Sequence, residues 1–590
     1  MTKYGKSLVA PVLHPLAPLR VGNDPSAPTP ALTHTTPPTP SHLHLADGMV
    51  AKDGRGIFRT LTSATIKNKA SRVGASQKRA YQAHLRYLQQ ETTVSLYQPS
   101  SPETRLTAMF VSMIQAYPKE HQPLFTLGDW ISSIPSKIGS CQVVTMAAEF
   151  LVCSFEVSRN RSYSNKILAL QAKAKALKEL QLGVLASQEI PTYDVVVATK
   201  LHYAAEILLG IESMHYAVHT LGLMDLLKSG VFSGADEEQL WSIIDNTYID
   251  DVTMAMTSGK TSLYDNDFYV SSTHPATLLD TSLTFMQSIA RAMMHILIQC
   301  PRLVLLIRHA ISEARDVVTL ASAISLAENL WQLAQASQYA DILSSCISAA
   351  NEAVDDTIAD IIPHGLRFNS IQSMIFCTRY WLLQVLLSGM MDTLYRHFPE
   401  QYGLSFLPDP DTLHSVDTDA ATQLGKVLLG LDESPALLIL VRIQGPLTAS
   451  VGSWHRVIRY LSSYQHASQA AALGVSETIV RAERMKQWLL ARTNQLQMRL
   501  NIIAVDEQAW LEALDCMAGE GMLDYIPTRV GFDCEDGEMV MKLEYDGVAG
   551  LRPNGSASSQ DTWILRIRNP SQFGLKHLRE WIKQHKASAG

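Results

Sequence analysis

The sequence has few cysteines, and none of them lies in a pattern that binds zinc or builds a disulfide framework. Seven cysteines are spread over 590 residues without a single Cys-x-x-Cys pair. This spacing excludes the common structural zinc motifs. Most of the cysteines have apolar neighbours, as expected of thiols that pack as small core residues in a reducing compartment. We therefore predict an intracellular protein.

The sequence also lacks an uninterrupted apolar segment of membrane-spanning length, which is about 18 residues or more. Hydrophobic residues make up 46% of the chain and charged residues 18%. The densest apolar stretch, residues 367–391, has Arg379 near its middle, and a central arginine costs about 2.5–3.5 kcal/mol on insertion. Residues 283–307 are interrupted by Arg291 and Pro301. We predict no transmembrane helix, and the lysines and prolines near the N-terminus predict no secretory signal.

Signatures of common catalytic sites are absent or incomplete. The sequence has no Gly-x-Ser-x-Gly elbow, no zinc tetrad and no dinucleotide-binding glycine motif after a strand. Residues 257–261, TSGKT, resemble the end of a phosphate-binding loop, but Met254 occupies the position of its first glycine. We therefore predict a polar surface loop over residues 255–276. His215 and His219 have metal-ligand spacing on one helical face, but no third ligand accompanies them, so a partly buried helix face is the favoured interpretation.

One acidic cluster leaves an enzymatic alternative open. Asp355, Asp356 and Asp360 lie within six residues of one another, and carboxylate oxygens suit Mg²⁺. Spaced aspartates on a helical frame could hold a magnesium–diphosphate pair, as in prenyl-transferring enzymes. However, Pro363 ends the helix within a turn, and no second acidic motif follows at comparable spacing. A solvated helix end is the favoured interpretation, and a Mg-dependent prenyl-transferring-type enzyme is the alternative function.

The first hundred residues differ in composition from the rest of the chain. Residues 1–60 hold nine prolines among many threonines, serines and histidines, which predicts disorder. The first hundred residues carry twelve basic and four acidic residues, a net charge of about +8, whereas the whole chain carries −7. The basic residues include two groups that could form a two-part nuclear import signal or contact nucleic acid: Lys67, Lys69, Arg72, Lys78 and Arg79. A solvated basic linker is the plainer alternative.

Hydrophobic periodicity beyond residue 100 predicts an all-α body. Ser101 is a candidate N-cap and Pro102 suits the first turn of a helix that begins near Glu103. Apolar residues then recur at helical spacing through most of the chain. The predicted helices cover residues 143–155, 164–182, 194–227, 277–299, 302–327, 328–347, 368–398, 417–431, 435–444, 447–463, 476–503 and 575–585. A further helix is predicted at residues 234–240, where either Ser233 or Asp236 can act as the cap.

The helix predicted over residues 164–182 is amphipathic. Lysines lie opposite its apolar side, and Gly183 is a plausible stop. The apolar positions at helical spacing are Ile167, Leu168, Leu170, Ala174, Leu177 and Leu180.

The C-terminal residues have a different pattern. Asp536-Gly537 lies between two alternating segments within residues 530–545, which predicts a β-hairpin, and residues 562–568, TWILRIR, could add a third strand. The predicted fold class is therefore all-α, a multi-helix bundle or array of stacked antiparallel helices with a small β-hairpin-containing extension. The predicted domains are a disordered and basic arm (1–100), a helical domain (101–505) and an α+β extension (506–590).

Three apolar helical stretches resemble the regulatory (middle-homology) domain of fungal Zn2Cys6 zinc-cluster transcription factors, over about residues 100–505. The stretches are residues 143–228, residues 366–391 (LRFNSIQSMIFCTRYWLLQVLLSGMM) and the pair formed by residues 453–461 and 481–496. The resemblance implies an all-α regulatory domain of a nuclear regulator. It also implies a buried central helix, whose core residues here are Tyr380, Trp381 and Leu386.

The chain departs from this family at its N-terminal side. Such regulators bind DNA through six cysteines that hold two zinc ions, but the first hundred residues here contain no cysteine. Either the chain is a relative without the zinc cluster, or coding sequence upstream is missing.

We therefore predict a nuclear, fungal-type transcriptional regulator that is not an enzyme and needs no cofactor or metal. Its expected partners are the transcription machinery or co-regulators, and an effector pocket within the helical domain is a further expectation. DNA binding is also left open, although the sequence contains no zinc cluster that would support it. A homo- or heterodimer is also open, and no membrane partner is expected.

Overall fold

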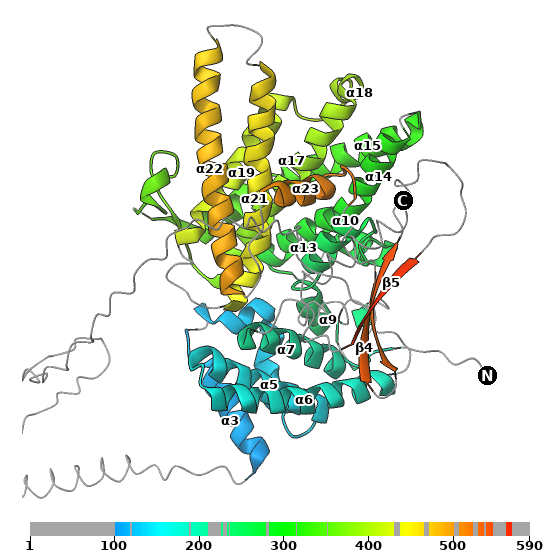
Figure 1. Cartoon of the computed structure of the whole chain (residues 1–590), viewed down its shortest axis with the longest axis vertical. Coiled ribbons are helices and arrows are strands. Elements are labelled where there is room, and N and C mark those ends of the chain that lie inside the picture. The colour runs from blue at the N-terminus through cyan, green and yellow to red at the C-terminus, as the bar shows by residue number, and fades with distance from the viewer. Residues whose placement is uncertain are drawn as a thin grey trace, which may run out of the picture. The chain divides into compact units, whose positions relative to one another are not determined.

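A computed structural model gives the fold of the chain. It describes residues 101–118, 121–187, 190–210, 233–234, 236–278, 283–313, 315–350, 352–429, 437–464, 471–500, 507–522, 529–535, 538–546 and 562–568, together with Leu223, Leu226 and Leu227. From Leu106 onward these residues belong to one unit. The described chain is predominantly helical, which confirms the predicted all-α character (Figure 1).

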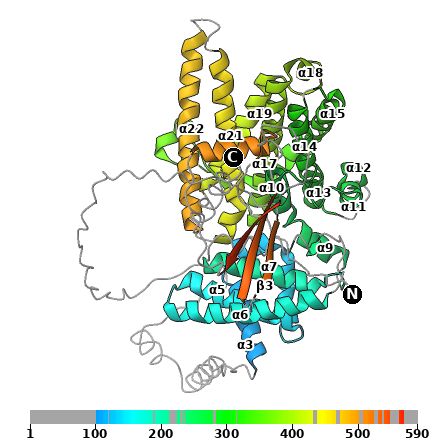
Figure 2. The same cartoon turned by 45° about the vertical axis from the view of Figure 1, so that its right-hand side comes forward.

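The first part of this unit is built from three long helices and short connecting turns. The helices α5, α6 and α7 pack against one another (Figure 2). The elements are α3 (Pro102–Ile114), η2 (Pro123–Leu127), η3 (Asp129–Ser133), α4 (Ile134–Lys137), α5 (Gln142–Arg159), α6 (Tyr163–Ala186) and α7 (Tyr193–Leu209).

The middle of the chain continues with shorter helices and one small β-ladder. Strands β1 (Ile347–Ala349) and β2 (Leu366–Phe368) pair antiparallel. The helical elements are α9 (Glu237–Ile244), α10 (Tyr248–Ser258), α11 (Asp267–Thr273), α12 (Pro275–Leu278), α13 (Phe285–Leu297), α14 (Cys300–Ser312), α15 (Val317–Ala334), α16 (Gln338–Cys346) and η4 (Asp356–Ile358).

The last helices surround one central helix, α17 (Ile371–His397), which packs against α19 and α21. Helices α21 and α22 lie side by side (Figure 1). The remaining elements are α18 (Pro399–Gly403), α19 (Pro410–Lys426), α21 (Leu437–Tyr464), α22 (Ala471–Arg499), α23 (Glu507–Met517), β3 (Arg529–Glu535), β4 (Glu538–Asp546) and β5 (Thr562–Arg568).

Helix α17 is the buried centre of this part of the unit. Its apolar residues are inaccessible on nearly every side, including Trp381 and Leu386, while Tyr380 is half-buried and stacks on Tyr339 at 4.8 Å between ring centroids. The Tyr380 hydroxyl donates to the carbonyl of Ala334 at 3.3 Å. A helix that is apolar all round belongs inside a core or a membrane, and here protein covers it.

Three described helical segments are long and apolar enough to cross a membrane by length and composition alone. Protein buries 89% of the apolar window of α17 and 72% of that in residues 285–312, but only 28% of that in α15. Burial in the core accounts for the apolar composition of the first two segments. The expectation of no transmembrane helix rested on charged residues within such segments, and it stays a prediction.

Side-chain caps mark several helix starts, and two of these caps, Ser101 and Asp236, are among the candidates expected from the sequence. The Ser101 hydroxyl accepts a hydrogen bond from the backbone N–H of Thr104 at 3.1 Å, so α3 begins where its cap and proline indicate. Asp236 and Gln239 form a capping box at α9. Ser370 caps α17 by accepting from the N–H of Ser373 at 3.0 Å. Local hydrogen bonding therefore fixes these boundaries.

Two predicted features of α6 are wrong. Gly183 does not end the helix, which continues to Ala186. The side that packs against the protein is lined by small residues, and most of the large apolar residues are exposed. Its buried residues are Ala169, Ala172, Ala176 and Leu180, whereas Ile167, Leu168, Leu170 and Leu177 are exposed. Close packing favours the alanines because they let neighbouring backbones approach.

The C-terminal strands confirm the predicted hairpin and its third strand. Strand β3 pairs with β4 in a register that joins Glu535 to Glu538, and β5 adds to the other edge of β4. The sheet is antiparallel with the order β3-β4-β5. The predicted boundary at residue 505 places α23 with this extension, but α23 packs against α10, α17 and α21 of the helical body. The helix predicted over residues 575–585 lies outside the described residues.

The polar loop predicted over residues 255–276 is also wrong. Helix α10 extends to Ser258 and ends at Gly259, which has a φ of 67° and caps the helix in the left-handed conformation. Helix α11 and the start of α12 follow within the same stretch. The TSGKT segment is therefore largely a helix end, which explains its glycine without a phosphate-binding role.

Candidate functional site

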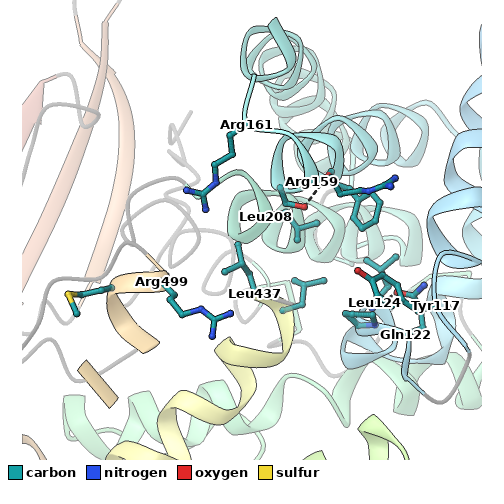
Figure 3. A pocket seen from close by; sticks show the side chains of 13 residues that line it. Tyr117, Gln122, Leu124, Arg159, Arg161, Leu208, Leu437 and Arg499 are labelled. Carbon is teal, nitrogen blue, oxygen red and sulfur yellow. Dashed lines mark hydrogen bonds between the residues drawn. The ribbon is translucent and has the colours of Figure 1, made fainter. Parts of the chain in front are cut away.

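One described cavity lies where several helices end. It encloses about 520 Å³, which is within the range of small-molecule sites. The residues that line it come from five separate segments of the chain. They are Tyr117, Gln122, Pro123, Leu124, Phe155, Ser158, Arg159, Arg161, Leu208, Leu437, Leu438, Met498 and Arg499. We refer to it as the arginine-rimmed cavity (Figure 3).

The floor of the arginine-rimmed cavity is apolar and buried. Leu124, Phe155, Leu208 and Leu438 are each less than a tenth exposed. Gln122 holds one wall in place: its side-chain nitrogen donates to the carbonyl of Met113 at 3.1 Å, and its side-chain oxygen accepts from the N–H of Leu124 at 3.2 Å. The polar groups of this wall are therefore already satisfied, and the floor offers mainly apolar contacts.

Three arginines give the rim a positive charge. Figure 3 shows Arg161 and Arg499 on either side of Leu437, with Arg159 beside Leu208. Arg159 is 3.8 Å from Glu156 and lies over the Phe155 ring at 5.8 Å. Arg161 and Arg499 form no ion pair with any residue that the structure describes. Two cations beside a buried apolar floor would suit a ligand that carries an anionic group on an apolar body.

Helix ends supply a partial structural reason for two of these arginines. Arg159 is in the last turn of α5 and Arg499 in the last turn of α22, where a positive charge interacts favourably with the helix dipole. This effect does not account for Arg161, because that residue follows the end of α5. The dipole also gives no reason for Arg161 and Arg499 to flank one cavity.

A second group of arginines pairs with buried carboxylates of α17 and α19. Arg456 of α21 donates to both carboxylate oxygens of Asp417 at 2.8 Å, and to the carbonyl of Val385 at 3.2 Å. Burial alone would lower the pKa of Arg456, but Asp417 raises it above its usual range. A Cβ atom at Gly389 or Gly452 would come within 3.1 or 3.0 Å of the guanidinium, so glycine makes room for this arginine.

Asp392 of α17 extends the same network. It accepts from Arg396 at 2.9 Å and from Arg459 at 2.6 Å. Arg396 also pairs with Glu520 at 2.6 Å, which ties the segment after α23 to α17. Charges in this part of the core are matched by partners, so the network is structural.

A smaller cavity of about 50 Å³ lies beside Gly445 and Pro446 of α21. Two of the residues that line it are already engaged: Arg442 pairs with Asp250 at 3.2 Å, and Arg379 donates to the carbonyl of Asp245 at 2.8 Å. The space holds a few water molecules and is much smaller than a small-molecule site. It is therefore a weaker candidate for a ligand site than the arginine-rimmed cavity.

Two of the three aspartates of the enzymatic alternative, Asp355 and Asp360, contact arginines of α22, whereas Asp356 is exposed. Asp355 accepts from Arg492 at 2.6 Å and from the indole N–H of Trp488 at 3.0 Å. Burial alone would raise the pKa of Asp355, but these hydrogen bonds lower it below its usual range. Asp360 accepts from Arg484 at 2.8 Å. Among the described residues, no group of three His, Cys, Asp or Glu side chains could hold a metal ion.

Other residues singled out in the sequence fall outside the described part of the chain. These are His215, His219 and the basic arm residues Lys67, Lys69, Arg72, Lys78 and Arg79. Trp381 and Leu386 are buried in the described core, and the half-buried Tyr380 packs against it. No local pattern in the sequence predicts the arginine-rimmed cavity, because segments that are distant in the chain form it. Only Arg161 stands out, as a cation beyond a helix end.

Comparisons with known proteins return no match: no family model, curated protein or solved structure is similar to this chain.

Proposed function

We propose that the protein is a nuclear, fungal-type transcriptional regulator whose helical body responds to a small molecule. The proposed ligand is an anion with an apolar body, and its site is the arginine-rimmed cavity. The single observation that carries the ligand part is the position of Arg161 and Arg499, without ion-pair partners among the described residues, beside the buried floor of Leu124 and Leu438. An anionic group between two arginines would form charge-assisted hydrogen bonds.

The transcriptional part is supported by the resemblance of residues 143–228 and 366–391 to the regulatory domain of fungal zinc-cluster factors. A predominantly helical body is what such a domain requires. We further propose that this body is an array of stacked antiparallel helices, for which the side-by-side pair of α21 and α22 is a partial example. The expected partners are co-regulators or the transcription machinery.

The nuclear part is tested by the location of the full-length protein in a fungal cell. A fluorescently tagged chain should accumulate in the nucleus, and replacing Lys67, Lys69, Lys78 and Arg79 with alanine should shift it to the cytosol. A matched control replaces four lysines outside this region. Cytosolic wild-type protein would contradict the nuclear assignment.

The regulatory part is tested by fusing the full chain to an unrelated DNA-binding domain and placing that domain's operator before a reporter. A regulator should change reporter output in either direction, relative to the DNA-binding domain alone. An unchanged output at equal expression would contradict transcriptional activity. It would leave the ligand site to be judged by direct binding.

A comparison of three compounds with purified protein tests the proposed ligand site. Octyl phosphate should raise the unfolding midpoint because it binds only the folded state. Octanol, which lacks the charge, and inorganic phosphate, which lacks the apolar body, should each have a much smaller effect. Equal stabilisation by inorganic phosphate would contradict the role assigned to the apolar floor.

A further inference from the structure

Helix α6 presents a stripe of exposed, mostly apolar side chains that the rest of the described protein does not cover. Tyr163 is 80% exposed, Leu170 is 42% exposed and Leu185 is 55% exposed. Single exposed leucines are common on protein surfaces, but aligned groups mark interaction sites. The residues that form this stripe are Tyr163, Ile167, Leu170, Ala174, Leu177, Gln181 and Leu185.

The spacing of the stripe is that of a coiled-coil seam. From Tyr163 to Gln181 its positions alternate by four and three residues along a helix of 24 residues. This alternation places Tyr163, Leu170 and Leu177 at d positions, and Ile167, Ala174 and Gln181 at a positions, over about three heptads. A polar residue at one a position is a common device for fixing register, so Gln181 fits the pattern.

The orientation of α6 is held from its other side. Ala169, Ala172 and Ala176 are buried, and α6 packs against α5 and α7. Lys173 reaches the buried carboxylate of Glu206 on α7 at 2.7 Å. These contacts leave α6 unable to turn its leucines inward without losing the alanine packing and the buried ion pair. The stripe is therefore a fixed surface of the folded protein.

The positive charge of the lysines beside the stripe indicates what kind of partner would bind there. Lys166 and Lys178 lie at the flanking g and e positions, are exposed, and form no ion pair among the described residues. Lys175 is also exposed and lies 3.8 Å from Glu149. Two copies of α6 would bring like charges together, which opposes pairing of the chain with itself. Glutamates at the flanking positions of a partner helix would pair with these lysines.

A lipid surface fits the stripe less well than a helix does. Membrane-bound helices present a broad apolar face, whereas Gln171, Lys178 and Gln181 lie within or beside this narrow stripe. We propose that the stripe of α6 docks an amphipathic helix of a partner protein, with apolar a and d positions and acidic flanks, as a two-stranded coiled coil.

The test uses the full-length protein and a labelled synthetic peptide of four heptads, with isoleucine at a, leucine at d and glutamate at e and g. Fluorescence anisotropy should detect binding. A peptide with lysine at e and g should bind about tenfold more weakly or worse, because it repels Lys166 and Lys178.

Variants locate the binding surface. The double variant Leu170→Gln/Leu177→Gln should weaken binding of the acidic peptide by about tenfold or more, since both leucines would be buried in the seam. Leu168→Gln is the matched control: the residue is on the same helix and 55% exposed, but lies off the stripe, so binding should be unchanged. Circular dichroism checks that both variants keep their helices. Lys166→Glu/Lys178→Glu should reverse the preference toward the lysine peptide.

Three results would overturn the proposal. The first is equal binding of both peptides by the wild-type protein. The second is self-association in sedimentation that Leu170→Gln/Leu177→Gln abolishes, which would assign the stripe to a second copy of the chain. The third is binding to vesicles of phosphatidylserine and phosphatidylcholine, lost in the same variant, without binding of the acidic peptide, which would assign it to a lipid surface.

Discussion

Arginines occupy two contrasting settings in the helical body. In the core, Arg456 is buried and both oxygens of Asp417 accept from it at 2.8 Å. At the arginine-rimmed cavity, Arg161 is exposed and has no ion-pair partner among the described residues. The buried Arg456 is not hydrated and depends on Asp417 to stabilise its charge. Arg161 at the rim stays hydrated until a ligand displaces the water around it.

This difference separates charges that hold the fold from charges that are available for binding. Removing one member of a buried pair leaves the other charge without water or partner, which is costly. Removing an exposed arginine costs the fold little. Stability and ligand affinity should therefore respond to substitutions in different places.

The largest effect is expected in the core. Arg456→Met should lower the free energy of unfolding by about 3–5 kcal/mol, because Asp417 stays buried without its cation. Chemical unfolding of the purified protein measures this change. The double variant Arg456→Met/Asp417→Leu is the control, and it should recover much of the loss because no unpaired charge remains. A small loss in the single variant would contradict a buried, dependent pair.

The next effect concerns a buried carboxylate without a cation. Asp251 accepts hydrogen bonds from Ser262 and from the N–H of Leu263, and burial raises the pKa of Asp251 to about 7 from an ordinary value of 3.8. The folded protein therefore holds the proton more tightly than the unfolded chain. The stabilisation that protonated Asp251 contributes is fully present below about pH 4 and is lost as the pH rises through 7.

Asp251→Asn removes this titration. The stability of the variant relative to the wild type should increase as the pH rises from 4 to 8, by about 4 kcal/mol or less. Unfolding experiments at a series of pH values measure the difference. Burial also raises the pKa of Asp245 to about 6, but that residue is present in both proteins and cancels. A difference that does not change with pH would contradict the assignment.

The smallest effect is expected at the surface. Asp360 and Arg484 are about half exposed although they pair at 2.8 Å, and solvent screens such pairs. Asp360→Asn should leave the unfolding midpoint unchanged within error. The same experiment addresses the enzymatic alternative: added Mg²⁺ should not stabilise the wild type more than the variant. Selective stabilisation of the wild type by Mg²⁺ would favour a metal site at Asp355, Asp356 and Asp360.

Local features of the fold could be predicted from the sequence. The caps Ser101 and Asp236 marked helix starts because they bond to backbone only three residues away. The hairpin of β3 and β4 followed from a two-residue turn between alternating segments. The apolar content of α17 likewise indicated a helix that must be covered.

Features that depend on distant partners could not be predicted. Arg379 reads as an interruption of an apolar helix, but its partner carbonyl belongs to Asp245, 134 residues away. Hydrophobic periodicity identified the apolar side of α6, yet the alanine side packs inward because close approach to α5 and α7 decides the interface. The arginine-rimmed cavity could not be predicted from the sequence for the same reason, because the segments that line it come together only in the folded protein.

Titration calorimetry of octyl phosphate into the wild type and the Arg161→Ala/Arg499→Ala variant tests the central claim most directly. The wild type should bind, and the variant should lose about tenfold to a hundredfold in affinity, since hydrogen bonds to charged groups contribute about 1.5–3 kcal/mol. Both proteins should unfold at the same denaturant concentration. Equal affinities, or a variant destabilised as strongly as Arg456→Met, would contradict the distinction between arginines that hold the fold and arginines that bind a ligand.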